Sequence, residues 1–342
     1  MANNITQVVT NPNPASAALV VREFSIVTRD AAGNITGVQN PYAEVDYKTS
    51  GGHSTYKALM LSLNRRASKG ISANVQYTLG KSRGTSGGSN EANTAANNAR
   101  TLEQFEYENG YNNFDVRHTF NASLILDVPF KGSGAVGAVL GGWQVGGILN
   151  ARSGLPLPVQ VVRPDVLYQD STSRLFYANP AVGRVAVLNT PRGGASRNVR
   201  RPDLIPGVDP YITSGGLLYL NPAAFAAPLP GTFGNLERNV LRGPGFVQTD
   251  LFFAKHVRAS RRDIELRVEV FNLFDTVNYA SPSVTLNAAV PANPGAANTL
   301  QPGQAYTAAA AGPTFGRLTS TVGRTVGLGT PRQVQFALRF SF

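Results

Sequence analysis

The sequence predicts an all-β fold, and three observations lead to this class. Apolar and polar residues alternate over about ten positions in several segments, as they do in a strand with one apolar face. Gly and Pro are plentiful, at 35 and 22 of 342 residues, and no segment shows a convincing helical period. No apolar run approaches the ~18 residues that a membrane-spanning helix needs. Together these observations favour strands throughout the chain.

The alternation places about nine strands along the chain. The first two show the weakest alternation, and the others are regular. We expect the strands at roughly 17–28, 38–48, 55–66, 71–83, 116–129, 142–152, 246–257, 263–275 and 332–342.

The strands are longer than those of soluble domains. Soluble strands usually have ~5–6 residues, whereas these have about ten to thirteen. A tilted strand of about 9–11 residues crosses a bilayer. The lengths therefore favour membrane-spanning strands over the strands of a soluble sandwich, which would alternate in the same way.

The connections alternate between short and long. Residues 66–70 and 258–262 form tight turns, and 130–141 form a somewhat longer Gly-rich link. The long polar stretches cover about 84–115, 153–245 and 276–331. This alternation is typical of an antiparallel transmembrane β-barrel with short periplasmic turns and long extracellular loops. We also expect aromatic residues at strand ends, such as Phe130 and Trp143, to form interfacial girdles.

The last strand shows the clearest alternation. Phe342, Phe340, Leu338 and Phe336 fall on one face, and Arg339 falls on the other. A C-terminal strand of this pattern, closed by Phe, resembles the signal by which outer-membrane β-barrels are recognised for assembly. The resemblance implies that these four residues form an assembly signal, that the barrel-assembly machinery is a partner, and that the protein lies in the cell outer membrane.

Three stretches stand out by their order along the chain. They are a hairpin over 54–82, the segment 114–123 followed by 142–147, and the segment 269–282 followed by 331–342. In this order, with a final Phe, they resemble the C-terminal barrel of TonB-dependent receptors. The subgroup with a carboxypeptidase-regulatory-like N-terminal domain is the most similar.

That resemblance implies a barrel of about twenty-two strands, closed by an N-terminal plug. Such a receptor imports nutrients across the outer membrane with energy delivered by TonB. This chain shows no plug, TonB box or signal peptide, and nine is an odd strand number for a bacterial barrel. We therefore interpret residues 1–342 as the C-terminal part of a larger plugged barrel. The TonB system would be a partner only through the missing N-terminal part, and the ligand is not predicted.

The chain is basic, with a net charge of +11, and part of the excess lies in the longest loop. Arg197, Arg200 and Arg201 make this loop a candidate contact for lipopolysaccharide phosphates or another anionic ligand. A solvated, non-specific basic surface explains the same residues. The sequence pI of about 10.1 suggests nucleic-acid binding only weakly, and no recognition module supports it.

The strand at 263–275 carries charges of alternating sign on one face. Glu265, Arg267 and Glu269 alternate there with apolar residues, and we expect them to line a polar lumen. Carboxylates about 7 Å apart also occur in some glycosidases, but the lumen explains these residues without a reaction.

The sequence offers no further chemistry, and we expect no enzyme activity, metal or cofactor. Zero cysteines exclude disulfides and thiol catalysis, and the three His residues lack metal-ligand spacing. Asp115 and His118 are three apart, which places them on opposite faces of a strand. Residues 132–137 have the spacing of a dinucleotide-binding loop, but we expect a Gly-rich turn with no helix after it.

Two other classes of protein are compatible with these patterns. One is a small, complete barrel that acts as a passive porin or a structural protein. The other is a secreted all-β binding or adhesion domain. A continuous apolar band on the outside of the sheet distinguishes the membrane barrels from the secreted domain, which would hide such a band in its core.

Overall fold

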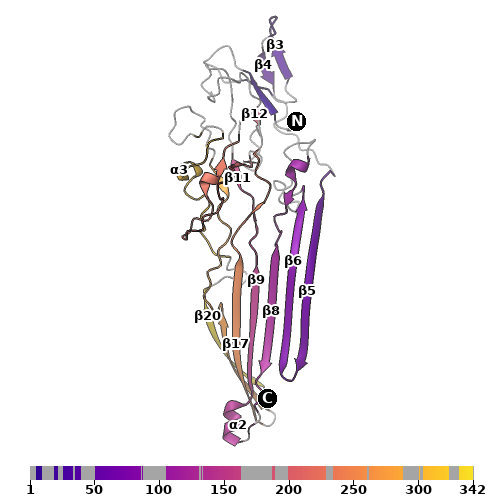
Figure 1. Ribbon diagram of the computed structural model, residues 1–342, viewed down its shortest axis with the longest axis vertical. Coiled ribbons are helices and arrows are strands. Elements are labelled where there is room, and N and C mark those ends of the chain that lie inside the picture. Colours follow the sequence, from indigo (N-terminus) through magenta and orange to yellow (C-terminus); the bar gives the residue numbers. More distant parts are fainter. Residues whose placement is uncertain are drawn as a thin grey trace.

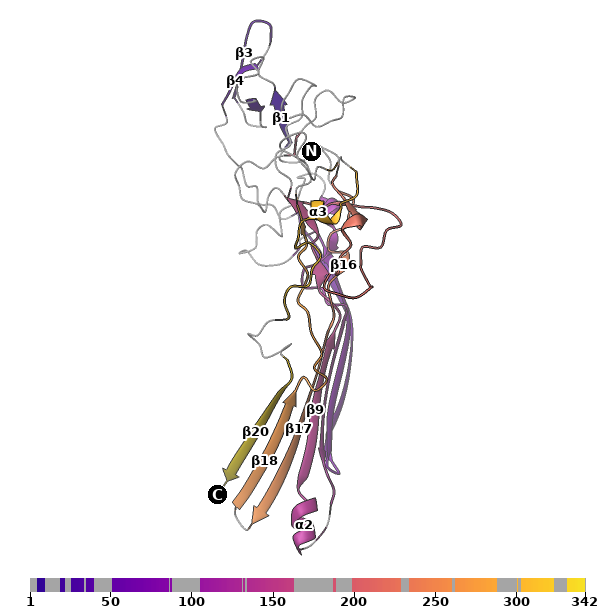
Figure 2. The ribbon, with the colours of Figure 1, turned by 90° about the vertical axis from the view of Figure 1, so that its left-hand side faces the viewer.

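One long antiparallel sheet dominates the computed structural model (Figures 1 and 2). The structure describes residues 5–9, 19–21, 26–33, 35–39, 51–85, 87, 105–130, 132, 134–162, 187–188, 199–228, 234–259, 262–287, 300, 303–322 and 331–341. The sheet has eight strands: β5 (Ser54–Ser68), β6 (Ile71–Gly84), β7 (Gly110–Tyr111), β8 (His118–Asp127), β9 (Trp143–Arg152), β17 (Phe246–Ala259), β18 (Arg262–Phe271) and β20 (Gln333–Ser341).

The long strands follow one another across the sheet in chain order. The order is β5-β6-β8-β9-β17-β18-β20, and the short β7 pairs with the end of β6. All these pairs are antiparallel. The seven long strands coincide with the last seven that the sequence predicts, which confirms the alternation, the lengths and the tight turns.

The first predicted strand is wrong, and most of the second lies outside the described residues. The expected strand over 17–28 is two pieces: β2 (Leu19–Val21) pairs with β1 (Ile5–Val9), which also pairs with β12 (Val187–Leu188). The second piece, β3 (Ile26–Arg29), forms a hairpin with β4 (Ile35–Gln39). A turn with Gly33 at a φ of 84° separates β3 from β4, and only a residue without a side chain adopts this φ readily. Of the expected strand over 38–48, residues 40–48 lie outside the described residues.

The register gives the sheet one apolar face and one polar face. Residues directly opposite each other in neighbouring strands point to the same face. One such row across six strands consists of Ile71, Leu126, Val145, Phe253, Val268 and Phe336. A row on the other face consists of Gln76, Asn121, Asn150 and Gln248.

The apolar face lies open, as Leu63 and Phe336 at 67% and 77% exposure show. An exposed apolar surface of this extent marks a membrane or protein contact rather than a soluble surface. Such a continuous apolar band is expected of a membrane barrel and not of a secreted domain. Among the described residues, no second sheet covers it.

The two ends of the sheet differ. At the short-turn end, Lys69 and Gly70 at φ of 53° and 78° close the β5–β6 hairpin. The β8–β9 link at this end contains helix α2 (Gly134–Leu140), so the expected turn without a helix is wrong. No helix among the described residues is long and apolar enough to cross a membrane.

At the other end, the loop end, the long connections pack together into a compact body. They contain the short elements η2 (Phe105–Glu108), β10 (Pro156–Leu157), β11 (Gln160–Val162), β13 (Val199–Arg200), β14 (Asp203–Leu204), η3 (Pro222–Ala224), β15 (Phe225–Ala226), β16 (Leu241–Arg242), β19 (Thr285–Leu286) and α3 (Ala308–Ala311). The buried apolar cluster lies here and includes Leu157, Val161, Leu220, Phe225, Leu286, Tyr306 and Phe315. The buried apolar cluster of the described residues therefore lies in the loops, while many large apolar side chains on one face of the sheet are exposed.

Candidate functional site

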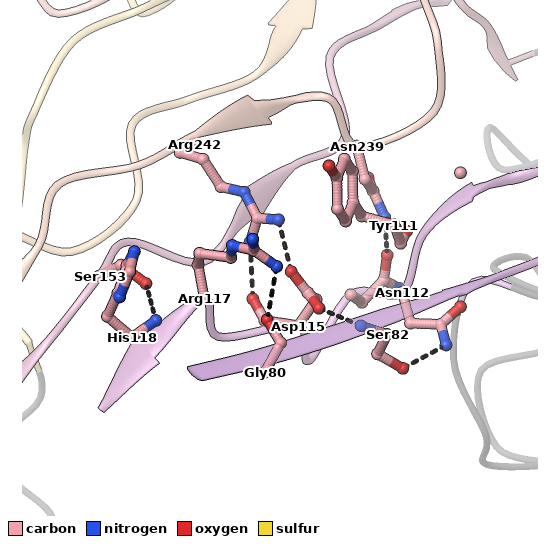
Figure 3. Close-up of polar contacts among 12 residues, drawn as sticks. Gly80, Ser82, Tyr111, Asn112, Asp115, Arg117, His118, Ser153, Asn239 and Arg242 are labelled. Carbon is pink, nitrogen blue, oxygen red and sulfur yellow. Dashed lines mark hydrogen bonds and ion pairs between the residues drawn. The ribbon is translucent and has the colours of Figure 1, made fainter. Parts of the chain in front are cut away.

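The polar contacts at the loop end join the longest loop to the strand ends (Figure 3). Asp115, just before β8, has a buried carboxylate that forms an ion pair with Arg242 of β16 and accepts the backbone N–H of Ser82. The same guanidinium donates to the Asp115 carbonyl oxygen at 2.7 Å. Charge-assisted bonds with two contacts fix orientation as well as distance. From the sequence, Asp115 and His118 are expected on one strand. This is wrong, because β8 begins at His118.

Arg238 holds a second junction. Its guanidinium donates to the carbonyl oxygens of Thr85 at 3.1 Å and Gly110 at 3.3 Å, and to that of Gly84. A Cβ at Gly110 would lie 2.4 Å from the Arg238 carbonyl oxygen, so the close approach requires glycine. Thus one buried guanidinium donates to three backbone carbonyl groups around the end of β6.

Asn239 continues this junction from a left-handed backbone conformation, at a φ of 59°. Its side-chain amide donates to the Tyr111 carbonyl oxygen and to Asn113 Oδ1, both at 2.7 Å. Asn tolerates this φ better than most residues. The pair Arg238 and Asn239 therefore joins the longest loop to the segment around β7.

Arg201 is one of the three loop arginines that the sequence singles out. Its guanidinium pairs with Glu108 at 2.8 Å, donates to the Tyr107 carbonyl oxygen at 2.7 Å, and stacks 4.0 Å from the centre of the Tyr107 ring. The ion pair is buried, so this arginine is engaged within the loops. Arg197 and the Arg200 side chain lie outside the described residues, and a ligand contact by these arginines stays a prediction.

Aromatic residues complete the loop end. The Arg242 and Arg83 guanidinium groups lie 4.5 and 4.9 Å from the centre of the Tyr111 ring, which is a favourable cation–π arrangement. Tyr219 donates its hydroxyl to the Arg242 carbonyl oxygen at 3.0 Å, and the Tyr211 hydroxyl accepts the Arg242 N–H at 2.8 Å. Burial raises the pKa of Tyr211 and of Tyr219, since it disfavours the phenolate.

The charged ladder lies on the polar face, as the alternation predicts. Arg267 lies 2.7 Å from Glu269 and 3.9 Å from Glu265, and its guanidinium packs 4.1 Å from the Phe252 ring centre. Both carboxylates thus share one cation, which suits a structural ladder. That this face lines a lumen stays a prediction.

The terminal strand is placed as predicted at three of the four signal positions. Phe336, Leu338 and Phe340 lie on the apolar face of β20, and all three are exposed. Phe342 lies outside the described residues. Recognition by the barrel-assembly machinery stays a prediction.

The polar contacts at the loop end attach the loops to the strand ends. Asp115 and Arg242 form an ion pair, and Arg238, Asn239 and Arg242 donate to backbone carbonyl groups. Within the described part of the chain, no three His, Cys, Asp or Glu residues are grouped to hold a metal ion. Sequence reasoning missed these residues, since their partners lie about 130 positions away and no spacing marks them.

Comparison with protein families gives a match over nearly the whole chain. A family model described as outer membrane beta barrel domain matches residues 2–335. Comparison with curated proteins gives no match.

Proposed function

The chain belongs to the family of outer membrane beta barrel domains, and from this premise we propose that it forms part of the wall of a TonB-dependent nutrient receptor. The protein lies in the outer membrane, and this family is generally non-enzymatic. Its exposed apolar face suits contact with lipid, and its polar face suits a lumen. With the short turns toward the periplasm, the packed loops face the outside.

The direction of the two edge strands carries the proposal. β5 and β20 are the ends of the sheet order, and their outer edges have no partner among the described residues. β5 is the first and β20 the last of seven strands that alternate in direction. Both therefore run from the loop end to the short-turn end. Direct pairing of β5 with β20 would therefore be parallel in an otherwise antiparallel sheet. An unpaired edge is not viable in lipid, which supports a wall that further strands complete.

The segment 269–282, which resembles the receptor family, forms a well-defined turn after β18. The Asn272 N–H donates to Asp250 Oδ1 at 2.8 Å, and the Asn272 side chain exchanges two hydrogen bonds of 3.0 Å with the Thr276 backbone. Asn272 and Asp275 have φ of 50° and 54°, a conformation that Asn and Asp tolerate. The receptor-like residues thus start the loop in a fixed direction.

The packed loop end also supports a receptor rather than a passive pore. Recognition sites commonly sit on loops that a rigid scaffold positions. Here buried ion pairs and an apolar cluster fix the loops, and loops held in one arrangement suit a defined ligand surface. The passive porin or structural barrel is the second candidate, whereas the outer-membrane location excludes the secreted domain.

Uptake measurements test the TonB coupling. We would compare strains with and without this gene, each with TonB intact or deleted, for uptake of a labelled panel of ferric siderophores, cobalamin and oligosaccharides. Deletion of the gene should abolish uptake of at least one compound, and deletion of TonB should abolish the same uptake with no additive effect. Gene-dependent uptake that persists without TonB would refute the receptor and favour the porin.

A further inference from the structure

Helix α2 is fixed to the apolar face of the sheet by two side chains. Lys255 belongs to the row Trp143, Lys255, Leu266 and Leu338 on that face. Its ammonium donates to the carbonyl oxygens of Ala138 at 2.7 Å and Val139 at 3.1 Å, and to that of Gly141. Trp143 Nε1 donates to the Val139 carbonyl oxygen at 3.0 Å. A cation and an N–H group thus satisfy the free carbonyl groups at the helix C-terminus.

These contacts also explain a charge on an apolar face. A Lys facing lipid is destabilising at the bilayer midplane and less so near the interface. Here the Lys255 side chain is buried, with its ammonium on the α2 carbonyls and 5.4 Å from the Trp143 ring centre. The helix therefore covers the charge, and the charge holds the helix.

The rest of α2 has little to stabilise it in water. Its seven residues, Gly-Ala-Val-Gly-Ala-Val-Leu, include two glycines and no charge, and isolated helices of this length are marginal. Val136, Val139 and Leu140, spaced as neighbours on one side of a helix, are 60%, 64% and 49% exposed. Ala138 lies on the opposite side. An uncharged helix with its largest side chains exposed suggests an apolar partner.

We propose that α2 is an interfacial anchor whose Val136, Val139 and Leu140 side enters the phospholipid leaflet that faces the periplasm. The helix continues the lipid-facing surface, because it is bonded to Trp143 and Lys255 within the apolar face. Trp at a membrane interface, with the apolar residues Leu266 and Leu338 in the same row, fits this depth. The anchor depends on the outer-membrane location and is independent of TonB coupling.

Spin labels can test the anchor, because the chain contains no cysteine. We would prepare Val136→Cys, Val139→Cys and the matched control Ala138→Cys in the full protein, label each with a nitroxide, and study outer-membrane vesicles. Leu266→Cys gives the reference for lipid and Lys69→Cys the reference for water. Labels on the Val side should show an oxygen-to-nickel-chelate accessibility ratio at least about threefold above that of Ala138 and close to that of Leu266.

Two results would overturn the proposal. Equal ratios at Val136, Val139 and Ala138 would mean that α2 stands in water. Protection of the Val side from both oxygen and the nickel chelate would mean that a protein covers it instead. Emission of the single Trp, Trp143, confirms in each variant that α2 stays docked, and a variant with shifted emission is replaced by Leu140→Cys.

Discussion

At the scale of single residues, the buried charges at the loop end have the largest energetic consequence. Asp115 has a side chain that is 1% exposed, and Arg242 supplies its countercharge. A buried pair adds little by itself, because desolvation offsets its attraction, but removing one partner leaves an uncompensated buried charge. The pair therefore makes the attachment of the longest loop sensitive to a single substitution.

The variant Arg242→Met should loosen the longest loop. Removing the guanidinium leaves the Asp115 carboxylate with the Ser82 N–H and no cation, which costs about 3 kcal/mol. The population of open loop should then rise on the order of 100-fold, since every 1.4 kcal/mol is tenfold. Cleavage by a non-specific protease on intact cells follows this population.

The matched control is Arg332→Met. Arg332 pairs with Asp275 at 3.7 Å, but both side chains are half exposed, at 51% and 52%. Exposed pairs contribute about 0–1 kcal/mol, so cleavage should change less than about fivefold. Equal protease sensitivity of the two variants would show that the Asp115–Arg242 pair does not hold the loop.

At the scale of elements, the long strands could be predicted because their alternation reports directly on the two faces. Leu338 and Phe340 alternate with Arg339, and the register later places them as that pattern requires. The β3–β4 hairpin was missed, because its strands have only four and five residues and such short segments give too little alternation to set their bounds. Helix α2 was missed as well, because its stabilising contact comes from Lys255, more than a hundred residues away.

The two adjacent glycines of β9 allow a prediction at this scale. A Cβ at Gly146, on the polar face, would lie 2.2 Å from the Phe252 ring and 3.0 Å from the Leu124 carbonyl oxygen. Gly146→Ala therefore has to displace the ring that packs against Arg267, and such overpacking costs about 1–3 kcal/mol. We expect the midpoint of urea unfolding to be lower than in the unchanged protein. Trp143 emission in membrane vesicles measures this unfolding.

Gly147→Ala is the control on the opposite face. Its nearest contact would be the Asp250 carbonyl oxygen at 3.2 Å, which requires a shift of only a few tenths of an ångström. The midpoint should change much less than in Gly146→Ala. A larger effect of Gly147→Ala would contradict the register that places Phe252 beside Gly146.

At the scale of the whole molecule, the chain separates a regular wall from a packed loop body. The sequence was sufficient to predict the long strands, since two faces of different polarity impose a simple two-residue period. It was not sufficient for the loop body, where Arg238 and Arg242 find partners by tertiary packing alone. Glu265, Arg267 and Glu269 lie on the polar face of a regular strand, and their position at a lumen stays a prediction.

We propose that this sheet is one arc of a larger wall, and the distance between its two edges tests this proposal. One register row runs from Arg65 on β5 to Val334 on β20. Spin labels on Arg65→Cys and Val334→Cys, in the otherwise cysteine-free chain, report this distance by double electron–electron resonance in outer membranes. The pair Arg65→Cys and Leu124→Cys, two strands apart, gives the control distance.

We expect a separation of about 25–29 Å between β5 and β20, because six inter-strand spacings of about 4.8 Å lie between them in a gently curved wall. A small barrel that closes on this chain alone would bring the same two labels to about 10–20 Å. The short distance, with the control unchanged, would contradict the larger wall and give preference to the small porin-like barrel.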